Sequence, residues 1–407
     1  MQDKQIEKLI KGEEARQKKV VNLIPSENYV SKDVLTALGS IFDNKYAEGY
    51  PHKRYYGGQT FTDKLELLCQ DRALKLFGLK STDWAVNVQP LSGAPANLAV
   101  YLALVPLNDR STSSGQGKIM GMTLTAGGHL SHGQKVSMTG KAWTQVSYGV
   151  DPKTEMIDYE ALKKQAIAEK PNLIVAGFTA YPREVDFKKF KEIADACGAY
   201  LMVDMSHFAG LVAGGVYNSP FVYADVVTTT THKTLRGPRG AIIFSRRNKT
   251  VKNSKGEDVS ISTLIDKAIF PGLQGGPHMG QVAGIAVALK EANTPAFKKY
   301  AKQVKINAKV LAENLQKLGW RIVSGGTDSH LLLVDTWMNG KGISGSEAEA
   351  KLEKAGIICN KNTIPGETRS AFDPSGIRIG SPAETTRGAK EKDMVKLAER
   401  IDKVLRK

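Results

Sequence analysis

The middle of the chain alternates short, uninterrupted apolar runs with a helical segment, and this pattern constrains the fold most strongly. The apolar runs are LIVAGF (173–178), YLMVDMS (200–206), ADVVTTTT (224–231) and GAIIFS (240–245), and each is typical of a buried strand. Residues 187–197 carry apolar side chains at helical spacing between the first two runs. Strand–helix–strand units with continuously apolar strands indicate a largely parallel sheet. We therefore predict an α/β fold.

The length of the chain, 407 residues, exceeds the roughly 100–200 residues of a single domain. Residues 1–42 are predicted to form a helical arm, residues 43–280 a large α/β domain and residues 281–407 a smaller C-terminal α/β domain. The arm has only a narrow apolar stripe, so we expect it to pack on another surface, such as a second subunit. A long helix is predicted to begin after Thr294 and Pro295, because proline is favoured in the first turn.

Composition argues against a membrane protein and against a disulfide framework. Hydrophobic residues make up 41% of the chain, and no run reaches the roughly 18 apolar residues of a membrane-spanning helix. The charged N-terminal segment lacks the apolar centre of a signal peptide. Cys69, Cys197 and Cys359 are widely spaced and form no CxxC pair. We expect a cytoplasmic protein with no metal and no membrane partner.

The net charge of +16 raises the question of nucleic-acid binding. The lysines are spread along the chain, mostly at helix-face spacing as in residues 297–318. Nucleic-acid-binding proteins more often cluster them with aromatic residues. We therefore expect a basic surface that attracts anionic substrates or keeps the protein soluble, and we treat nucleic-acid binding as the alternative.

The segment VVTTTTHKTLRGPRG (226–240) carries the clearest chemical signal. Four consecutive threonines suit neither a helix nor an exposed strand, and they fit a cleft that is lined by hydroxyl groups. Lys233 follows them, and a lysine nucleophile must be kept from bulk water to have a lowered pKa. Asp204, Thr230 and His232 also fall at or beyond predicted strand ends, where ligands bind in open α/β sheets. We predict that these groups meet in one crevice.

This segment resembles the cofactor-lysine segment of the serine hydroxymethyltransferase family. Seven further segments resemble that family in the same order: NLIPSENYVS (22–31), NKYAEGYPHKRYYGG (44–58), NVQPLSGAPAN (87–97), GGHLSHG (127–133), VDMSHFAGLVAGGVY (203–217), FPGLQGGP (270–277) and SGIRIGSPA (375–383). The resemblance thus covers nearly the whole chain. It implies the aspartate-aminotransferase-like fold of pyridoxal-phosphate enzymes, fold type I, with a large, mostly parallel sheet domain and a smaller C-terminal α/β domain.

The resemblance implies a pyridoxal-phosphate site in which Lys233 holds the cofactor covalently. A carboxylate at Asp204 would pair with the pyridine nitrogen and keep the ring an electron sink. His129 would lie against the ring, and His207 and Thr179 would lie near its phenolic oxygen. The remaining cofactor contacts implied are Ser92, Gly93, Ala94 and Thr230, together with Tyr46 and Gly276 from a neighbouring subunit.

One feature of the phosphate contacts follows from the residues themselves, and two more are implied by the resemblance. The segment SGAPAN opens an apolar helix, and backbone amides at a helix N-terminus suit a phosphate. Some relatives have a second serine where Ala94 stands, so one hydroxyl contact is expected to be missing here. The contacts from a neighbouring subunit imply an active site that is completed only in a homodimer or a larger assembly such as a tetramer.

Substrate recognition is expected to centre on Arg378, because a guanidinium binds a carboxylate with two parallel hydrogen bonds. The resemblance adds Ser26 as a contact to the same carboxylate. It also implies that Glu48 transfers a proton, that Tyr56 approaches the substrate, and that His232 is a catalytic group.

The folate site rests on resemblance alone. Leu124, Gly128 and Leu130 are similar to positions that contact the pterin, and Asn362 is similar to its hydrogen-bonding partner. The segment from Ser370 to Phe372 would lie nearby. Three features depart from the family on this side: Thr125, Ala126 and a loop over 108–118 that is longer than usual.

The expected enzyme is a glycine hydroxymethyltransferase, which converts serine and tetrahydrofolate reversibly to glycine and methylenetetrahydrofolate. The nearest alternative is a folate-independent aldolase of the threonine type, which would use the same lysine but not Asn362. A catalytically inactive structural subunit is a third alternative, and the joint presence of Lys233, Asp204, Arg378 and Glu48 argues against it.

Overall fold

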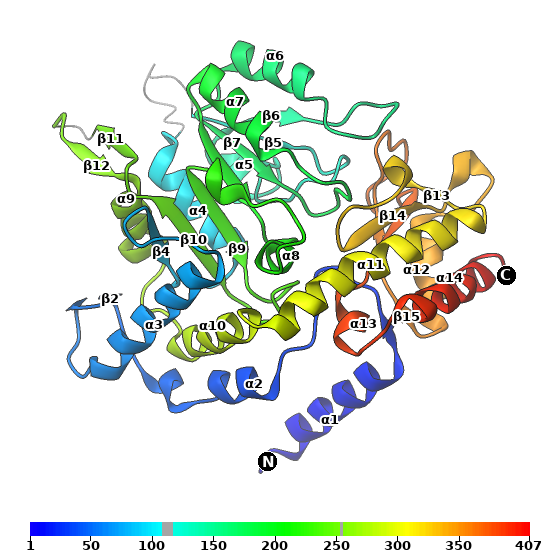
Figure 1. Ribbon diagram of the computed structural model, residues 1–407, viewed down its shortest axis with the longest axis horizontal. Helices are drawn as coiled ribbons and strands as arrows, with labels where there is room; N and C mark the ends of the chain where they lie inside the picture. The colour runs from blue at the N-terminus through cyan, green and yellow to red at the C-terminus, as the bar shows by residue number, and fades with distance from the viewer. Residues whose placement is uncertain (108–116, 253–254) are drawn as a thin grey trace.

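The computed structural model describes residues 1–107, 117–252 and 255–407 (Figure 1). The longer loop expected at 108–118 therefore lies almost entirely outside the described residues.

A seven-stranded sheet forms the centre of the larger part of the protein, with strand order β4-β10-β9-β8-β7-β5-β6. Its strands are β4 (Trp84–Asn87), β5 (Lys118–Met122), β6 (Thr144–Tyr148), β7 (Leu173–Gly177), β8 (Tyr200–Asp204), β9 (Val226–Thr230) and β10 (Ala241–Arg246). Strand β10 runs antiparallel to both neighbours, and the other described pairs in this sheet are parallel. The predicted strands and the mostly parallel sheet are confirmed.

Alternate residues of these strands face two separate cores, so the sheet is covered on both sides. Ile174 and Ala176 of β7 face a core formed with α3 (Thr60–Leu76), α6 (Tyr159–Glu169), α7 (Phe187–Cys197), α8 (Ala209–Ala213) and α10 (Met279–Ala292). Leu173 and Val175 face the opposite core, formed with α4 (Gly93–Leu104) and α9 (Ile261–Lys267). This burial on both faces explains why the strands are apolar throughout.

Another core, here called the C-terminal core, surrounds the four-stranded antiparallel sheet β13-β14-β17-β16. The elements of this part are β13 (Arg321–Ile322), β14 (Leu331–Asp335), α12 (Gly345–Lys354), β15 (Ile357–Ile358), β16 (Asn360–Asn362), β17 (Gly376–Gly380), α13 (Pro382–Thr386) and α14 (Glu391–Leu405). Helix α11 (Pro295–Lys317) starts at the predicted place, where Thr294 accepts a hydrogen bond from the amide of Phe297. It runs between the two parts of the molecule (Figure 1), with Val304 in the core that contains Ile174 and Leu311 in the C-terminal core.

The α-helices of the N-terminal arm are α1 (Lys4–Lys19) and α2 (Lys32–Leu38). Between them, β1 (Val21–Asn22) pairs in parallel with β15, and Leu23 is buried in the C-terminal core. Helix α1 has no buried residue, so its apolar stripe stays exposed in the single chain. The domain limits 1–42, 43–280 and 281–407 remain a prediction.

The remaining described elements are short. They are β2 (Gly49–Tyr50), β3 (Lys53–Arg54), α5 (Met138–Ala142), β11 (Thr250–Lys252), β12 (Asp258–Ser260), the 3-10 helices Ile41–Asn44, Pro220–Val222, Val323–Gly325 and Met338–Gly340, and the π-helical segment Ala268–Leu273. Across the described ranges, no helix combines the length and the apolar character that a membrane crossing requires. The same ranges contain no group of three or more His, Cys, Asp or Glu side chains that could bind a metal ion.

Candidate active site

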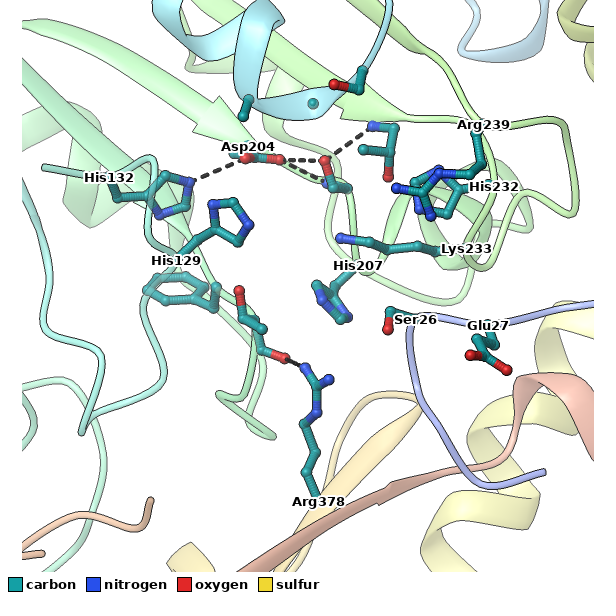
Figure 2. Close-up of a pocket in the computed structure, with 17 residues that line it drawn as sticks. Ser26, Glu27, His129, His132, Asp204, His207, His232, Lys233, Arg239 and Arg378 are labelled. Carbon is teal, nitrogen blue, oxygen red and sulfur yellow. Dashed lines mark hydrogen bonds and ion pairs between the residues drawn. The ribbon is translucent and has the colours of Figure 1, made fainter. Parts of the chain in front are cut away.

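A cavity of about 390 Å³ opens beyond the ends of β7, β8 and β9, next to the start of α4 (Figure 2). This volume lies in the range of roughly 300–1,000 Å³ that is typical of small-molecule sites. The cavity is lined by Ser26, Glu27, Ser92, Gly93, Ala94, His129, His132, Phe178, Thr179, Asp204, Ser206, His207, Thr230, His232, Lys233, Arg239 and Arg378. The arm, the large sheet and the C-terminal sheet therefore all contribute to it.

Lys233 lies just beyond β9, and its side chain reaches into the cavity (Figure 2). The residue is 9% exposed. Burial lowers the pKa of its amine to about 8, while Asp204 opposes that shift and Arg378 adds to it. A much larger share of this lysine is thus neutral near pH 8 than of an ordinary lysine, which titrates near 10.4. A neutral amine is the form that attacks a carbonyl carbon.

Asp204 ends β8, and protein donors occupy both of its carboxylate oxygens. Its Oδ1 accepts hydrogen bonds from the backbone N–H and the hydroxyl of Ser206, at 3.0 and 2.5 Å. Its Oδ2 lies 2.8 Å from Asn97 Nδ2 and 3.0 Å from His132 Nε2. Burial alone would raise the pKa of Asp204, but His132, Lys233 and Ser206 outweigh it and hold the pKa well below its usual range. The group is a fixed anion.

Four histidines around the cavity are kept neutral by burial. Burial lowers the pKa of His129 to about 4, and that of His232 and of His330 to about 3. Burial likewise takes the pKa of His207 well below its usual value. The rings of His207 and His330 stack with centroids 5.4 Å apart, and Nδ1 of the first lies 3.2 Å from Nε2 of the second. Neutral rings of this kind can both donate and accept hydrogen bonds.

Arg378 enters the cavity from β17 of the C-terminal sheet (Figure 2). Its Nε donates to Asn360 Oδ1 at 3.0 Å, and its Nη1 donates to the carbonyl of Thr179 at 2.7 Å. Burial lowers the pKa of its guanidinium to about 10. Among the described side chains no carboxylate makes an ion pair with it, so its charge is available to a bound anion.

The start of α4 has the properties of a phosphate cradle. Ser92 is the N-cap residue, yet its hydroxyl makes no capping hydrogen bond. Thr230 Oγ1 is buried beside it without a described partner. Gly93 leaves the space between them, because a Cβ there would come within 2.7 Å of Thr230 Cγ2. Free hydroxyls beside the amides of a helix N-terminus fit a phosphate group, and a neutral lysine amine fits an aldehyde. The residues present are thus compatible with pyridoxal phosphate.

The four threonines do not line the cleft together, so that part of the prediction is wrong. Thr230 alone among them reaches the cavity. Thr228 donates to Asn97 Oδ1 at 2.7 Å, and Thr231 donates to the carbonyl of Pro238 at 2.6 Å. Thr229 donates to the backbone carbonyl of Thr230. Because side chains alternate along a strand, consecutive residues cannot all face one cleft.

Four other predicted residues lie outside this cavity in the single chain. Tyr46 and Gly276 line a separate pocket. Glu48 Oε1 lies 3.3 Å from the hydroxyl of Tyr46, whose ring packs edge-on against that of Tyr56. Tyr46 and Tyr56 are 59% and 50% exposed.

The predicted folate residues gather on two neighbouring segments. The first holds Leu124, Gly128 and Leu130, and the two leucines are 38% and 48% exposed. The second begins at Asn362, whose neighbour Thr363 lies 3.5 Å from the carbonyl of Leu124. Ser370 and Phe372 are exposed further along, with the phenyl group 86% accessible. Of the two departures in the first segment, Thr125 is exposed and Ala126 is buried.

Sequence reasoning missed several side chains that line or support the cavity. Glu27, His132, Ser206 and Arg239 line it, and Asn97 and His330 stand directly behind it. His132 and Ser206 belong to segments already singled out, GGHLSHG and VDMSHFAGLVAGGVY. Asn97 ends another such segment, NVQPLSGAPAN, but nothing in that motif links it to Asp204, and only the fold brings the two side chains together.

A mostly parallel sheet with a buried lysine beyond its strand ends and a fixed carboxylate beside it defines an α/β enzyme of fold type I. Comparison with known families gives the same answer and a more specific one. The family model described as serine hydroxymethyltransferase matches residues 1–401. The chain therefore belongs to the serine hydroxymethyltransferase family, and the predicted family and fold class are confirmed.

Similar proteins come from bacteria and eukaryotes. A serine hydroxymethyltransferase of Desulfotalea psychrophila is 51% identical over 404 residues, which span 99% of this chain and 89% of that protein. A probable cytosolic serine hydroxymethyltransferase of Schizosaccharomyces pombe is 48% identical over 411 residues, spanning 99% and 86%. A mitochondrial serine hydroxymethyltransferase of Kluyveromyces lactis is 50% identical over 412 residues, spanning 99% and 80%.

Proposed function

We propose that this protein transfers the hydroxymethyl group of serine to tetrahydrofolate, giving glycine and methylenetetrahydrofolate, and that it also runs the reverse reaction. The observation that carries the proposal is the buried amine of Lys233, which shares one cavity with the anion of Asp204 and the cation of Arg378. Membership of the serine hydroxymethyltransferase family supports the same reaction. The folate-independent aldolase is not favoured by any of these comparisons.

The proposed cofactor is pyridoxal phosphate, which when bound supplies an electron sink for cleavage at the α-carbon of an amino acid. Lys233 would hold it covalently, and Asp204 would stabilise a proton on the pyridine nitrogen. Ser92, Thr230 and the amides at the start of α4 would hold its phosphate, with Ala94 offering an amide but no hydroxyl. The neutral rings of His129 and His207 line the same cavity and can pack on the ring or bond its substituents without adding charge.

Arg378 would bind the carboxylate of serine, with Ser26 as a further donor. Two contacts to protein acceptors already orient its guanidinium, and the second amino group remains to face the substrate. Serine bound in this way would have its α-carbon between the arginine and the lysine, and Lys233 could then accept or release a proton there.

Glu48, Tyr46, Tyr56 and Gly276 would act in the cavity of a second subunit. Their absence from the Lys233 cavity of the same chain and the exposure of both tyrosines support this arrangement. We therefore propose a homodimer with shared active sites, in which Glu48 moves a proton on the serine hydroxyl. A dimer of dimers would preserve the same shared sites.

Folate would bind beside the segment from Leu124 to Leu130, against Asn362 and the exposed segment around Phe372. Exposed leucine and phenylalanine side chains suit the flat pterin and benzoyl rings. A cytoplasmic location stays a prediction, because relatives are named for the cytosol and for the mitochondrion alike.

The test is a visible absorption spectrum of the purified protein with pyridoxal phosphate and glycine, before and after adding tetrahydrofolate. We expect a yellow protein whose red-shifted band with glycine grows strongly only when folate is present. A yellow protein that does not respond to folate would overturn the hydroxymethyl transfer in favour of the aldolase. A colourless protein would overturn the proposed role of Lys233.

A further inference from the structure

The side chain of Asn28 lies where the arm, the lysine loop and the C-terminal part meet. Its Nδ2 donates to the backbone carbonyl of Lys233 at 3.0 Å and to the hydroxyl of Tyr300 at 2.7 Å. Its Oδ1 accepts from the hydroxyl of Thr386 at 2.7 Å and from the amide of Tyr29 at 2.9 Å. All of the principal hydrogen-bonding positions of this amide are therefore used, each toward a different element.

The carbonyl of Lys233 has a second donor that reinforces the first. The amide of Arg236 donates to it at 3.1 Å, and Arg236 adopts the left-handed conformation with φ of 58°. A non-glycine residue keeps this φ only where its surroundings hold it. Its guanidinium lies over the rings of Tyr300 and Phe297, 4.3 and 5.2 Å from their centroids. The backbone under the lysine is thus fixed from two sides, and both lead to Tyr300.

The arm on the other side of Asn28 is fixed to the C-terminal sheet that carries Arg378. Leu23 donates its amide to the carbonyl of Ile358 at 2.7 Å, and its own carbonyl accepts from Gly380 at 2.8 Å. A Cβ on Gly380 would come within 2.8 Å of Pro25, so the arm lies directly on β17. Ser26 stands between this contact and Asn28, in the wall of the cavity.

We infer that Asn28 is a positioning residue that sets the backbone of Lys233 relative to the substrate contacts Ser26 and Arg378. The inference rests on the proposed role of Lys233. A long lysine side chain has many rotamers. When a hydrogen bond fixes the backbone carbonyl of the lysine, the amine can move only by rotation about the side-chain bonds. Without the hydrogen bond from Asn28, the amine is still present but is less often aligned with the carbon that it attacks. The condensation is then slower, because the reaction needs a near-attack geometry.

The test follows the condensation of pyridoxal phosphate with the cofactor-free protein at pH 8, by absorbance, alongside its thermal unfolding. We expect Asn28→Ala to condense about tenfold more slowly than the unsubstituted protein, the effect of one hydrogen bond. The matched control is the double variant Tyr300→Phe with Thr386→Val, which removes other partners of Asn28 but keeps its bond to Lys233. We expect this control to unfold at a lower temperature yet to condense within twofold of the unsubstituted rate.

Each other outcome decides against the inference. If Asn28→Ala condenses within twofold of the unsubstituted protein, or if the double variant is as slow as Asn28→Ala, Asn28 has only a structural role. A second readout separates the same two cases: a positioning role lowers kcat for serine cleavage, whereas a structural role lowers only the unfolding temperature. If the unsubstituted protein itself does not condense and matches Lys233→Gln, the proposed function fails and the inference with it.

Discussion

Nε2 of His132 lies 3.0 Å from Oδ2 of Asp204, and this contact joins the loop after β5 to the end of β8 (Figure 2). The imidazole is 1% exposed and its other nitrogen, Nδ1, has no described partner. Asn97 shares the same carboxylate oxygen, and Thr228 in turn donates to Asn97. The carboxylate therefore keeps its orientation and its charge without any ligand, which is the preorganisation expected of a group that stabilises a distant positive charge.

Removing the negative charge of Asp204 tests its role directly. Asp204→Asn keeps the size of the side chain and removes the anion, and we expect kcat for serine cleavage to fall at least about hundredfold, as when preorganised electrostatic contacts are lost. The measurement is kcat at saturating pyridoxal phosphate. Asp225→Asn is the matched control, because that aspartate is also buried but caps the start of β8 through the amide of Leu201. Equal losses of kcat in both variants would contradict the prediction.

The lowered pKa of Lys233 predicts an unusual pH profile. The cofactor-free protein should condense with pyridoxal phosphate at a rate that rises with pH and reaches half its maximum near pH 8, because burial lowers the pKa of the amine to about 8. An ordinary lysine would place that midpoint near 10.4. The rate is followed by absorbance from pH 6 to 10, with Lys233→Gln as the blank. A midpoint above pH 10 would contradict the lowered pKa of Lys233.

Arg378 is predicted to determine the affinity for the substrate carboxylate. Arg378→Lys keeps the charge but loses the planar fork, so we expect KM for serine to rise about 10- to 100-fold, the effect of losing a charge-assisted hydrogen bond. The KM for tetrahydrofolate should change less than about twofold. Arg183→Lys serves as the control, because Arg183 bonds the carbonyl of Ser324 outside the cavity. A larger rise in KM for tetrahydrofolate than for serine would contradict the role of Arg378 in binding the serine carboxylate.

The fold and much of the cavity could be predicted because local patterns carry them. A fully buried parallel strand must be apolar throughout, so 173–178 and 200–206 are recognisable from the sequence alone. Lys233 and Asp204 stand directly after such strands, and the ends of parallel strands meet at one edge. The position of each group along the chain then suffices to bring them together.

The parts that could not be predicted depend on contacts between distant segments. Asn97 reaches Asp204 across 107 residues of sequence, and Asn28 reaches Lys233 across 205. Neither asparagine differs locally from one that caps a turn. The prediction for the four threonines was wrong for the opposite reason. Four identical neighbours suggested one shared role, whereas strand geometry sends alternate side chains to opposite faces.

The neutral histidines around the cavity predict how stability depends on pH. In the unfolded chain a histidine takes up a proton below about pH 6.5, whereas burial keeps the pKa of His232 and of His330 near 3 in the folded protein. The unfolded state therefore binds more protons, and the free energy of unfolding falls as pH falls from about 6.5 toward 4.

Each such histidine contributes a loss of about 1.4 kcal/mol per pH unit in that window. The check is urea unfolding of the cofactor-free protein at pH 7.5, 6.0 and 5.0. In His330→Gln the slope of stability against pH should decrease by the equivalent of one proton. His52→Gln is the control, because its side chain is exposed. An unchanged slope in His330→Gln would mean that this ring is not held neutral.

The last prediction concerns the shared active site. If Glu48 acts in the cavity of the partner subunit, a subunit carrying Lys233→Gln and one carrying Glu48→Gln each lack activity as pure dimers. A mixed dimer contains one cavity with the intact lysine of one subunit and the intact glutamate of the other. Random exchange puts about half of the subunits into mixed dimers, and half of their cavities are intact, so activity should recover to about a quarter of the unsubstituted value.

The experiment mixes the two variants under mild, reversible denaturation and measures serine cleavage after refolding. The control mixes Lys233→Gln with Asp204→Asn, two residues that line the same cavity of one chain. Because both residues come from one chain in this fold, every cavity of the control retains one change, and we expect no recovery of activity. Recovery of activity in the control would contradict the shared site. So would a mixture of Lys233→Gln with Glu48→Gln that recovers no activity.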